Sequence, residues 1–329
     1  MNYCFGVQSK NSVDVLIDFS LKNSELNITF IPSRRQIDYN GGYVNNWTTC
    51  SFANYVKSKN SNIKIERDHG GPGQGYYDDD GYESLREDCK YFDIIHIDPW
   101  KKYKNLMDGM EWTANMITFC YNINPTIEYE IGTEEAIRPF TIEELEELIL
   151  YLKTSLTEDI YNKIRFLVIQ SGTRLLEGKN TGVFDEEKLK NMLLLSKKYN
   201  LISKEHNGDW LTIDNIKLKQ KYGLDIINIA PELGMIESSI IIDYIKYYPE
   251  YFDRVYNICL ESNLWKKWVS DDFDYSNNKE DIIKISCHYH FTNDEIVIIK
   301  NKFSEIDHVI QEKIFLRYKE LYHYNELYD

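Results

Sequence analysis

The sequence IKIERDHGGPGQG, residues 63–75, runs from a short alternating strand pattern into an aspartate, a histidine and a glycine-rich loop. Three other stretches also run from a strand pattern into polar residues, and each places His, Asp or Glu where a strand should end. They are IIHIDPW (94–100), TIEYEIG (126–132) and LISKEH (201–206). In a (β/α)8 barrel the carboxyl ends of all strands open onto one face, where active sites are built. These stretches therefore predict that residues far apart in the sequence share one pocket.

Eight short β-rich runs predict an α/β fold of the TIM-barrel type, because helical patterns such as TIEELEELILYLKTSL (141–156) lie between them. Regular β-then-α alternation implies a parallel sheet with right-handed crossovers. An open doubly wound sheet is the alternative, but no GxGxxG turn follows the first run. The runs are NYCFGV (2–7), NITFI (27–31), IKIER (63–67), IIHID (94–98), TIEYEI (126–131), FLVIQ (166–170), LISKEH (201–206) and DIINIA (225–230).

The alternation stops near residue 246. Residues 247–269 and 301–329 have helical patterns, and the polar stretch DDFDYSNNKED (271–281) reads as a linker between them. We therefore expect a barrel of residues 1–245 that carries the site, and a helical extension of residues 246–329 packed on it.

The composition limits the partners that this chain can have. Its 329 residues carry a formal charge of −15, which argues against nucleic acid and against an anionic membrane surface. No apolar stretch approaches the ~18 residues of a membrane span, and no signal peptide is apparent. The cysteines lack the spacing of a metal site and are expected to be free thiols, as in the reducing cytoplasm, so we expect a cytoplasmic protein. These cysteines are Cys4, Cys50, Cys89, Cys120, Cys259 and Cys287.

Two strand ends carry a histidine together with an aspartate. Asp68 and His69 are adjacent, so one could bind a metal while the other moves a proton. A capping aspartate and a surface histidine in a glycine-rich turn are the alternative. His96 and Asp98 alternate and so share one side of their strand, either facing the site or forming an outward polar pair. We take Asp68 and Asp98 as candidate catalytic residues.

Two further strand ends add acidic groups and a third histidine. Carboxylates inside a barrel are unfavourable unless they are paired or bind a metal, so Glu130 is both a catalytic and a metal-ligand candidate. Glu134 is a second candidate ligand, although it equally suits the start of a solvated helix. His206 ends the seventh run and is a metal-ligand candidate with His69.

Arg34 and Arg35 form the one basic pair with anion-binding character at a strand end, and a surface ion pair is the alternative. His288 and His290 lie in the extension, where they could cap the pocket or belong to a surface element. No Walker loop, nucleophile elbow or HExxH motif is visible. The expected substrate-binding residues are Arg34, Arg35, Gln36, His96, Gln170, Arg174, Asp209 and Asn228.

From about residue 6 to its end the chain resembles the tagatose-bisphosphate aldolase accessory-subunit family, the GatZ/KbaZ type, within the class II aldolase-like barrels. The segments that carry this resemblance are RQIDYNGGYVNNWTTCSFANYV (35–56), ERDHGGPGQ (66–74), IIHIDPW (94–100), YEIGTEE (129–135) and KEHNGDWLT (204–212). The resemblance implies that Asp68 is the proton-transfer residue, that His69 and His206 are zinc ligands and that Asn228 contacts substrate. It implies a divalent metal, with zinc expected first and manganese, cobalt or magnesium as alternatives.

The chain also departs from the superfamily pattern. Where a middle zinc histidine is expected, SGTRLLEG (171–178) offers Arg174 and Leu175, so a metal would need Glu130, Glu134 or Asp98 instead. Asp209 and Trp210 replace small phosphate-binding residues, and Pro231 lacks an amide donor. Arg34, Arg35 or Arg174 could supply an anion site in their place.

Three functions are compatible with these residues. The first is a metal-dependent lyase that performs aldol and retro-aldol chemistry on a sugar or sugar phosphate. The second is a ketose or ketouronate 4-epimerase that breaks and re-forms the same bond. The third is a non-catalytic subunit that stabilises a separate aldolase, which makes a partner aldolase subunit or a homo-oligomer an expected assembly.

Overall fold

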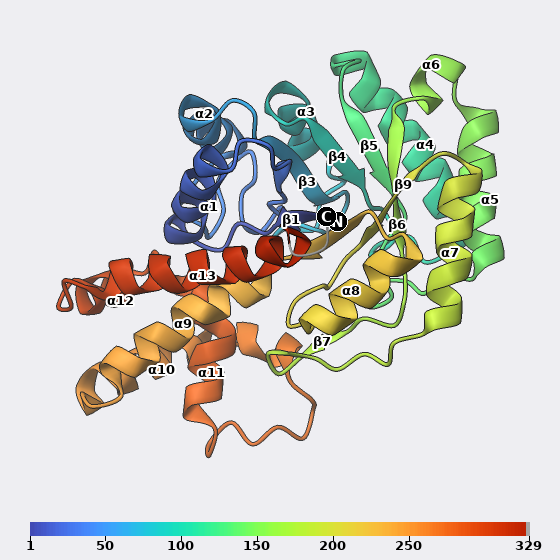
Figure 1. Ribbon diagram of the computed structural model, residues 1–329. Helices are drawn as coiled ribbons and strands as arrows, with labels where there is room; N and C mark the ends of the chain where they lie inside the picture. Colours follow the sequence, from blue (N-terminus) through green and yellow to red (C-terminus); the bar gives the residue numbers. More distant parts are fainter. Residues whose placement is uncertain (327–329) are drawn as a thin grey trace.

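The computed structural model describes residues 1–326 of the chain. Eight parallel strands form a closed barrel (Figure 1) in the order β1-β10-β9-β6-β5-β4-β3-β2. The predicted (β/α)8 barrel is confirmed, and each predicted run overlaps one of the strands, although β3 extends three residues past its run and β6 begins two residues before its run. The strands are β1 (Asn2–Phe5), β2 (Ile28–Phe30), β3 (Lys64–Gly70), β4 (Ile94–Ile97), β5 (Glu128–Ile131), β6 (Ile164–Ile169), β9 (Ile202–Glu205) and β10 (Ile226–Ile229).

Helices cover the outside of the barrel, which explains why the strands are apolar on both faces. All four residues of β4 (IIHI) and of β10 (IINI) are buried. Local signals start the helices: Thr141 and Glu144 form a capping box, and Asn105 caps the next helix upstream. The helices are α1 (Lys10–Lys22), α2 (Thr49–Lys59), α3 (Tyr82–Tyr91), α4 (Leu106–Ile123), α5 (Ile142–Ser155), α6 (Glu158–Tyr161), α7 (Glu186–Lys198), α8 (Ile213–Tyr222) and α9 (Pro231–Ile245).

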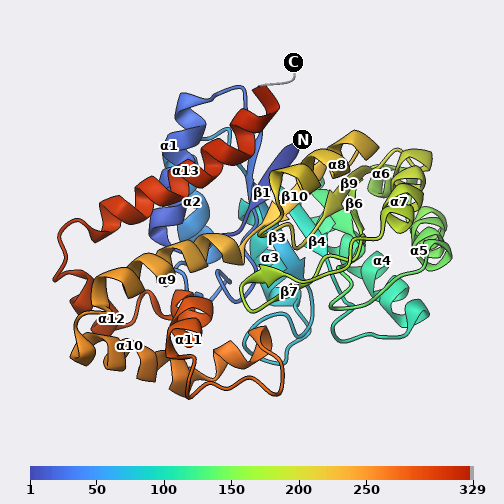
Figure 2. The same cartoon turned by 60° about the horizontal axis from the view of Figure 1, so that its bottom comes forward.

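The chain continues after α9 into further helices. The last helix returns to the barrel and lies beside α1 (Figures 1 and 2), where the Tyr318 ring is 4.8 Å from that of Phe5 and the Tyr322 ring is 5.2 Å from that of Tyr3. Residues 327–329 of the predicted extension lie outside the described residues. The elements are α10 (Pro249–Ser262), η1 (Leu264–Trp268), α11 (Lys279–Ser286), η2 (Cys287–His290), α12 (Asp294–Lys300) and α13 (Ile306–Glu326).

Two features of the structure were not predicted, one in the extension and one in the barrel. The polar linker ends at residue 278, and α11 follows because Ile282, Ile283 and Ile285 are buried. A short antiparallel hairpin, β7 (Leu175–Leu176) with β8 (Lys179–Asn180), interrupts the loop after β6.

Among residues 1–326, no helix combines the length and apolar character that a membrane crossing requires.

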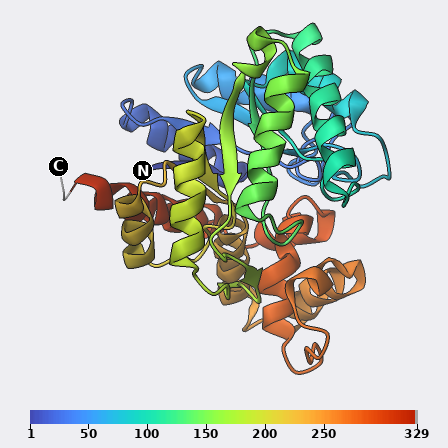
Figure 3. The same ribbon diagram turned by 90° about the vertical axis from the view of Figure 1, so that its right-hand side faces the viewer.

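The extension lies at the carboxyl end of the barrel strands. In Figure 3 the strand arrow points toward the orange helices of the extension. Trp268 and Tyr289, which belong to η1 and η2, line the same cavity as Asp68 at the end of β3. The extension therefore forms part of the wall around the barrel mouth.

A lysine and two glutamates form a charged layer inside the barrel. The Lys204 Nζ lies 2.5 Å from Glu66 Oε2 and 2.6 Å from Glu130 Oε2, and all three side chains are almost completely buried. Burial alone would lower the pKa of Lys204, but the neighbouring acidic groups hold it well above its ordinary value. Burial and the neighbouring Glu130 raise the pKa of Glu66 well above its ordinary value, so the ammonium is chiefly the counter-charge of Glu130.

Replacing Lys204 with methionine should lower the free energy of unfolding by about 3–5 kcal/mol, because the buried Glu130 carboxylate would lose its cation. Urea denaturation of the two proteins measures the difference. Lys198→Met is the control: its ammonium contacts Glu146 at the solvent-exposed surface, so its removal should leave the free energy of unfolding nearly unchanged. Equal stability of Lys204→Met and the parent protein would contradict this role.

Candidate functional site

Asp68 and His69 both face the barrel mouth because β3 is irregular at its end. Neighbouring residues of a regular strand point to opposite sides. The pairing of β3 with β4 shifts register between Arg67 and Gly70, and His69 has a φ of 51°, in the left-handed region. Strained backbone of this kind is concentrated at functional sites. Gly71 permits the close approach of the two strands, since a Cβ there would lie 2.4 Å from the Asp98 carbonyl oxygen.

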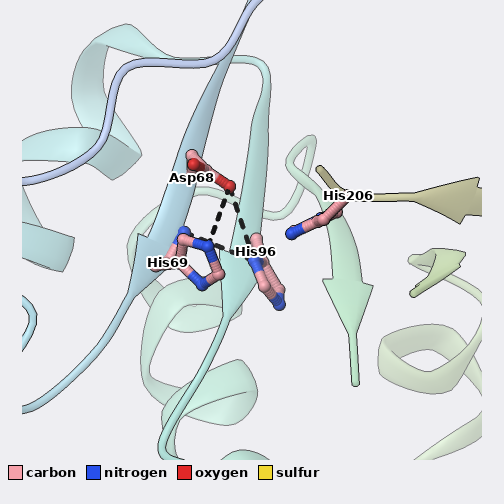
Figure 4. A group of neighbouring side chains, drawn as sticks. All are labelled: Asp68, His69, His96 and His206. Carbon is pink, nitrogen blue, oxygen red and sulfur yellow. Dashed lines mark hydrogen bonds and ion pairs between the residues drawn. The ribbon is translucent and has the colours of Figure 1, made fainter. Parts of the chain in front are cut away.

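Three imidazole rings meet at this point (Figure 4). The ring centres of His69 and His96 are 5.0 Å apart, and His206 lies 5.2 Å from each of them. Together with Asp68, these residues offer ligand atoms that all lie within 4.8 Å of one another. Residues more than a hundred positions apart in the sequence are thus brought together, as predicted for the barrel mouth.

The hydrogen bonds of His96 assign the roles of its two ring nitrogens. Its Nε2 is 2.9 Å from the Gly132 carbonyl oxygen, which can only accept, so the proton is assigned to Nε2. Its Nδ1 then carries the lone pair and accepts the backbone N–H of His69 at 3.3 Å. His96 was predicted to bind substrate, whereas here it presents a lone pair to the other two histidines.

Asp98 orients the His69 ring. Its Oδ2 lies 2.6 Å from His69 Nδ1 and also accepts from Gln74 and Thr133, while its Oδ1 accepts the Trp100 backbone N–H. The carboxylate is fully buried. His69 Nδ1 is thereby assigned as a donor, and Nε2 faces the site. Asp98 was predicted as a catalytic residue, and in this structure its contacts are with protein groups.

Glu130 orients the His206 ring in the same way. Its Oε1 lies 2.7 Å from His206 Nε2, and its Oε2 is bound to Lys204. Burial alone would raise the pKa of Glu130, but Lys204, His96 and His206 hold it well below its ordinary value. Glu130 was predicted as a catalytic residue and a ligand; both of its oxygens are engaged by protein cations and rings.

Glu134 faces the two remaining ring nitrogens. Its Oε2 is 3.3 Å from His69 Nε2 and 3.3 Å from His206 Nδ1. Burial alone would lower the pKa of His206, but Glu130, Glu134 and Asp68 raise it to about 9. A ring that holds this proton would have to lose it before its nitrogen could bind a cation.

This donor set fits a divalent metal. It offers three imidazole nitrogens with carboxylates beside them, the ligand types that zinc and its neighbours prefer. Each ring makes its second hydrogen bond to a carboxylate or a carbonyl, which is the usual arrangement around metal-binding histidines. No third histidine ligand was predicted from the sequence, and His96 can take that role. Its position at the end of β4 was the signal from which this role could have been predicted.

A cavity of about 230 Å³ opens beside the histidines. Arg35, Gln36 and Asn228, which were predicted to bind substrate, line it together with Asp209. Three almost fully buried polar atoms in its wall have no hydrogen-bond partner among the described side chains; they are Gln8 Oε1, Asn228 Oδ1 and His288 Nδ1. Buried polar atoms of this kind normally have a partner, so they mark places for polar groups of a ligand.

Other predicted substrate-binding residues lie elsewhere. Arg34 is buried and pairs with Asp38 and Asp79, at 2.9 and 2.6 Å. The Gln170 amide accepts the Phe140 backbone N–H and donates to two backbone carbonyls. Arg174 is exposed at the start of the hairpin. Among the described residues, none of these three lines the cavity. Arg34 and Gln170 are held by contacts with residues distant in the sequence, which the strand pattern does not reveal.

Asp209 has a structural contact as well. Its Oδ1 accepts the backbone N–H groups of Ala230 and Glu232, at 2.9 and 2.8 Å, and so caps the start of α9. The residue lines the cavity, but this carboxylate oxygen is directed at the helix.

Three residues that shape the site, Lys204, Gln8 and Lys267, were not predicted from the sequence. Lys204 could have been found, because it lies two positions before His206 and so shares its side of β9. Gln8 follows β1 and satisfies the same strand-end rule as the histidines. Lys267 carried no signal, because nothing in the sequence places the extension over the barrel mouth.

No protein-family model matches the chain, and no curated protein matches it in sequence. Solved structures are nevertheless similar over most of its length. A probable tagatose 6-phosphate kinase from Sinorhizobium meliloti 1021 has a TM-score of 0.75 and 14% identity, over 93% of this chain and 87% of its own. The fructose-bisphosphate aldolase from Campylobacter jejuni has a TM-score of 0.60 and 13% identity, over 98% and 89%. The YdjI aldolase from Escherichia coli K12 has a TM-score of 0.53 and 13% identity, over 91% and 90%.

At these identities the similarity shows the fold alone. The chain therefore has the barrel fold of aldolases, and its own residues must carry any argument about activity.

Asp98→Asn should weaken Zn²⁺ binding by about 10–100-fold, because it weakens the acceptor that orients His69. Competition with a chromophoric chelator measures the affinity, and circular dichroism checks the fold. Asp108→Asn removes an exposed carboxylate and should leave the affinity unchanged. Parent-like affinity in Asp98→Asn would show that His69 does not need this partner.

Proposed function

We propose that this protein is a metal-dependent, aldolase-type lyase that cleaves a ketose or ketose phosphate. The observation that carries the proposal is the convergence of three oriented imidazoles and Asp68 at the mouth of a barrel, beside a cavity. A pure scaffold has no need of polar groups collected in one pocket. The non-catalytic subunit is therefore the weaker alternative.

We assign His69, His96 and His206 as the metal ligands. The outer hydrogen bonds to Asp98, the Gly132 carbonyl and Glu130 leave one nitrogen of each ring toward the common centre. Three protein ligands leave positions for substrate oxygens, as in catalytic zinc sites. Zinc is the first choice, because imidazole nitrogens dominate the set.

A bound divalent cation would polarise the substrate carbonyl and stabilise the negative charge that develops on its oxygen. Asp68 is the proposed base for the substrate hydroxyl proton. Burial alone would raise the pKa of Asp68, but His69, His96 and His206 lower it below its ordinary value. When the rings are neutral ligands, a bound cation would take over the role of these imidazole charges and hold Asp68 ionised, which is the form that accepts a proton.

The cavity wall suits a substrate with several hydroxyl groups. The carbonyl oxygens of Gln8 and Asn228 can accept hydroxyl hydrogens, and His288 offers a third unpartnered polar atom. Such groups discriminate strongly, because a substrate that lacks a matching hydroxyl would leave them buried without a partner.

The fold and the sequence motifs support the same reading. Two of the similar structures are named as aldolases, and two of the names refer to tagatose 6-phosphate or fructose bisphosphate, which are ketose phosphates. We propose that the chain belongs with the tagatose-bisphosphate aldolase accessory-subunit family, whose motifs at Asp68, His96 and His206 it carries.

The protein loaded with Zn²⁺ should release a triose or triose phosphate from ketoses or ketose phosphates without any other subunit. Asp68→Asn should keep its metal and lose turnover by at least about 10²-fold, because it removes the proton acceptor. Coupled detection of the triose measures turnover, and elemental analysis measures the metal. The control is Asp78→Asn, which changes an exposed carboxylate.

Formation of an epimer without a released fragment, or no reaction of the metal-loaded protein, would contradict a lyase. Parent-like turnover in Asp68→Asn would remove Asp68 as the base.

A further inference from the structure

Two cations line the cavity without an acidic partner. Arg35 follows β2, and Lys267 belongs to η1 in the extension. Among the side chains that the structure describes, neither forms an ion pair with a carboxylate. The neighbouring buried cations are paired: Arg34 binds Asp38 and Asp79, and Lys204 lies between two glutamates. Arg35 is half-buried and Lys267 is exposed, so both cations stand at the wall of the cavity with their charges available to a ligand.

Aromatic rings hold Lys267 in place. Its Nζ lies 4.8 Å from the ring centre of Trp268 and 4.8 Å from that of Tyr289. The Trp268 Nε1–H donates to the Tyr289 hydroxyl at 2.9 Å, and the Tyr43 ring packs edge-on against Tyr289 with centres 5.0 Å apart. Tyr43 lies in the loop that carries Arg35, so these rings connect the extension to the barrel loop.

The two cations repel each other. The Arg35 Nε donates to the Gly75 carbonyl at 3.4 Å, which leaves its charge uncompensated. The Lys267 side chain is exposed to solvent at the cavity wall, where the surrounding protein atoms, Arg35 and Lys101 lower its pKa. A bound anion would relieve this repulsion.

The ordinary anion-binding position at this face is filled. Backbone N–H groups at a helix start commonly bind phosphate. At α9 these groups are taken by the Asp209 carboxylate, and Pro231 offers no amide hydrogen. An anionic substrate therefore has to find its counter-charge elsewhere in the cavity.

We propose that Arg35 and Lys267 form an oxyanion subsite that binds the phosphate or carboxylate group of the substrate. This inference rests on the proposed function for the sugar to which that group is attached. The guanidinium supplies a planar pair of donors and the ammonium supplies a point charge, which together suit either oxyanion. Lys267 makes the extension a determinant of substrate specificity.

Isothermal titration calorimetry of the full chain, treated with chelator so that no metal competes, tests the subsite with inorganic phosphate and with acetate. At least one anion should bind saturably. Arg35→Gln and Lys267→Gln should each weaken that binding by about tenfold or more, since each removes a charged contact. Lys266→Gln is the matched control, because it removes the same charge from the adjacent exposed residue.

Phosphate binding that both variants weaken would indicate a sugar phosphate, and acetate binding alone would indicate a sugar acid; both support the subsite. Saturable binding of neither anion would overturn it. Equal loss in Lys266→Gln would also overturn it, because the effect would then be one of general charge. These measurements involve no turnover, so failure of the lyase assay leaves their result unaffected. Cleavage of neutral ketoses without anion binding would overturn the subsite alone.

Discussion

The contact between Lys204 and Glu130 links the interior of the barrel to its site. The Lys204 ammonium contacts Glu66 and Glu130 inside the barrel and compensates the charge of Glu130, which in turn forms a hydrogen bond with His206. A carboxylate without that cation would be strongly unfavourable in the core. The same charges that are needed to bury a glutamate therefore fix the orientation of a ring at the mouth.

The other two rings are fixed by comparable means. His96 is held by a backbone carbonyl after β5 and His69 by a buried carboxylate after β4, so each strand end orients the ring on its neighbour. The irregular end of β3 turns Asp68 and His69 to one side. The arrangement requires a closed barrel, because only closure brings β9 and its His206 opposite β3.

The extension completes the pocket that the barrel begins. Lys267, Trp268, His288 and Tyr289 line the cavity although they follow the last strand by more than thirty residues. The barrel thus supplies the reactive groups, and the extension supplies much of the wall.

The sequence by itself determined the barrel, because eight apolar runs alternating with helical patterns leave few other folds. It also determined that Asp68, His69, His96 and His206 lie at strand ends, and strand ends of a parallel barrel share one face. Only the tertiary structure decided which way each side chain is used. Arg34 and Arg35 are neighbours in the sequence, yet Arg34 forms ion pairs with Asp38 and Asp79, whereas Arg35 lines the cavity. Such choices depend on contacts with distant residues, which periodicity does not encode.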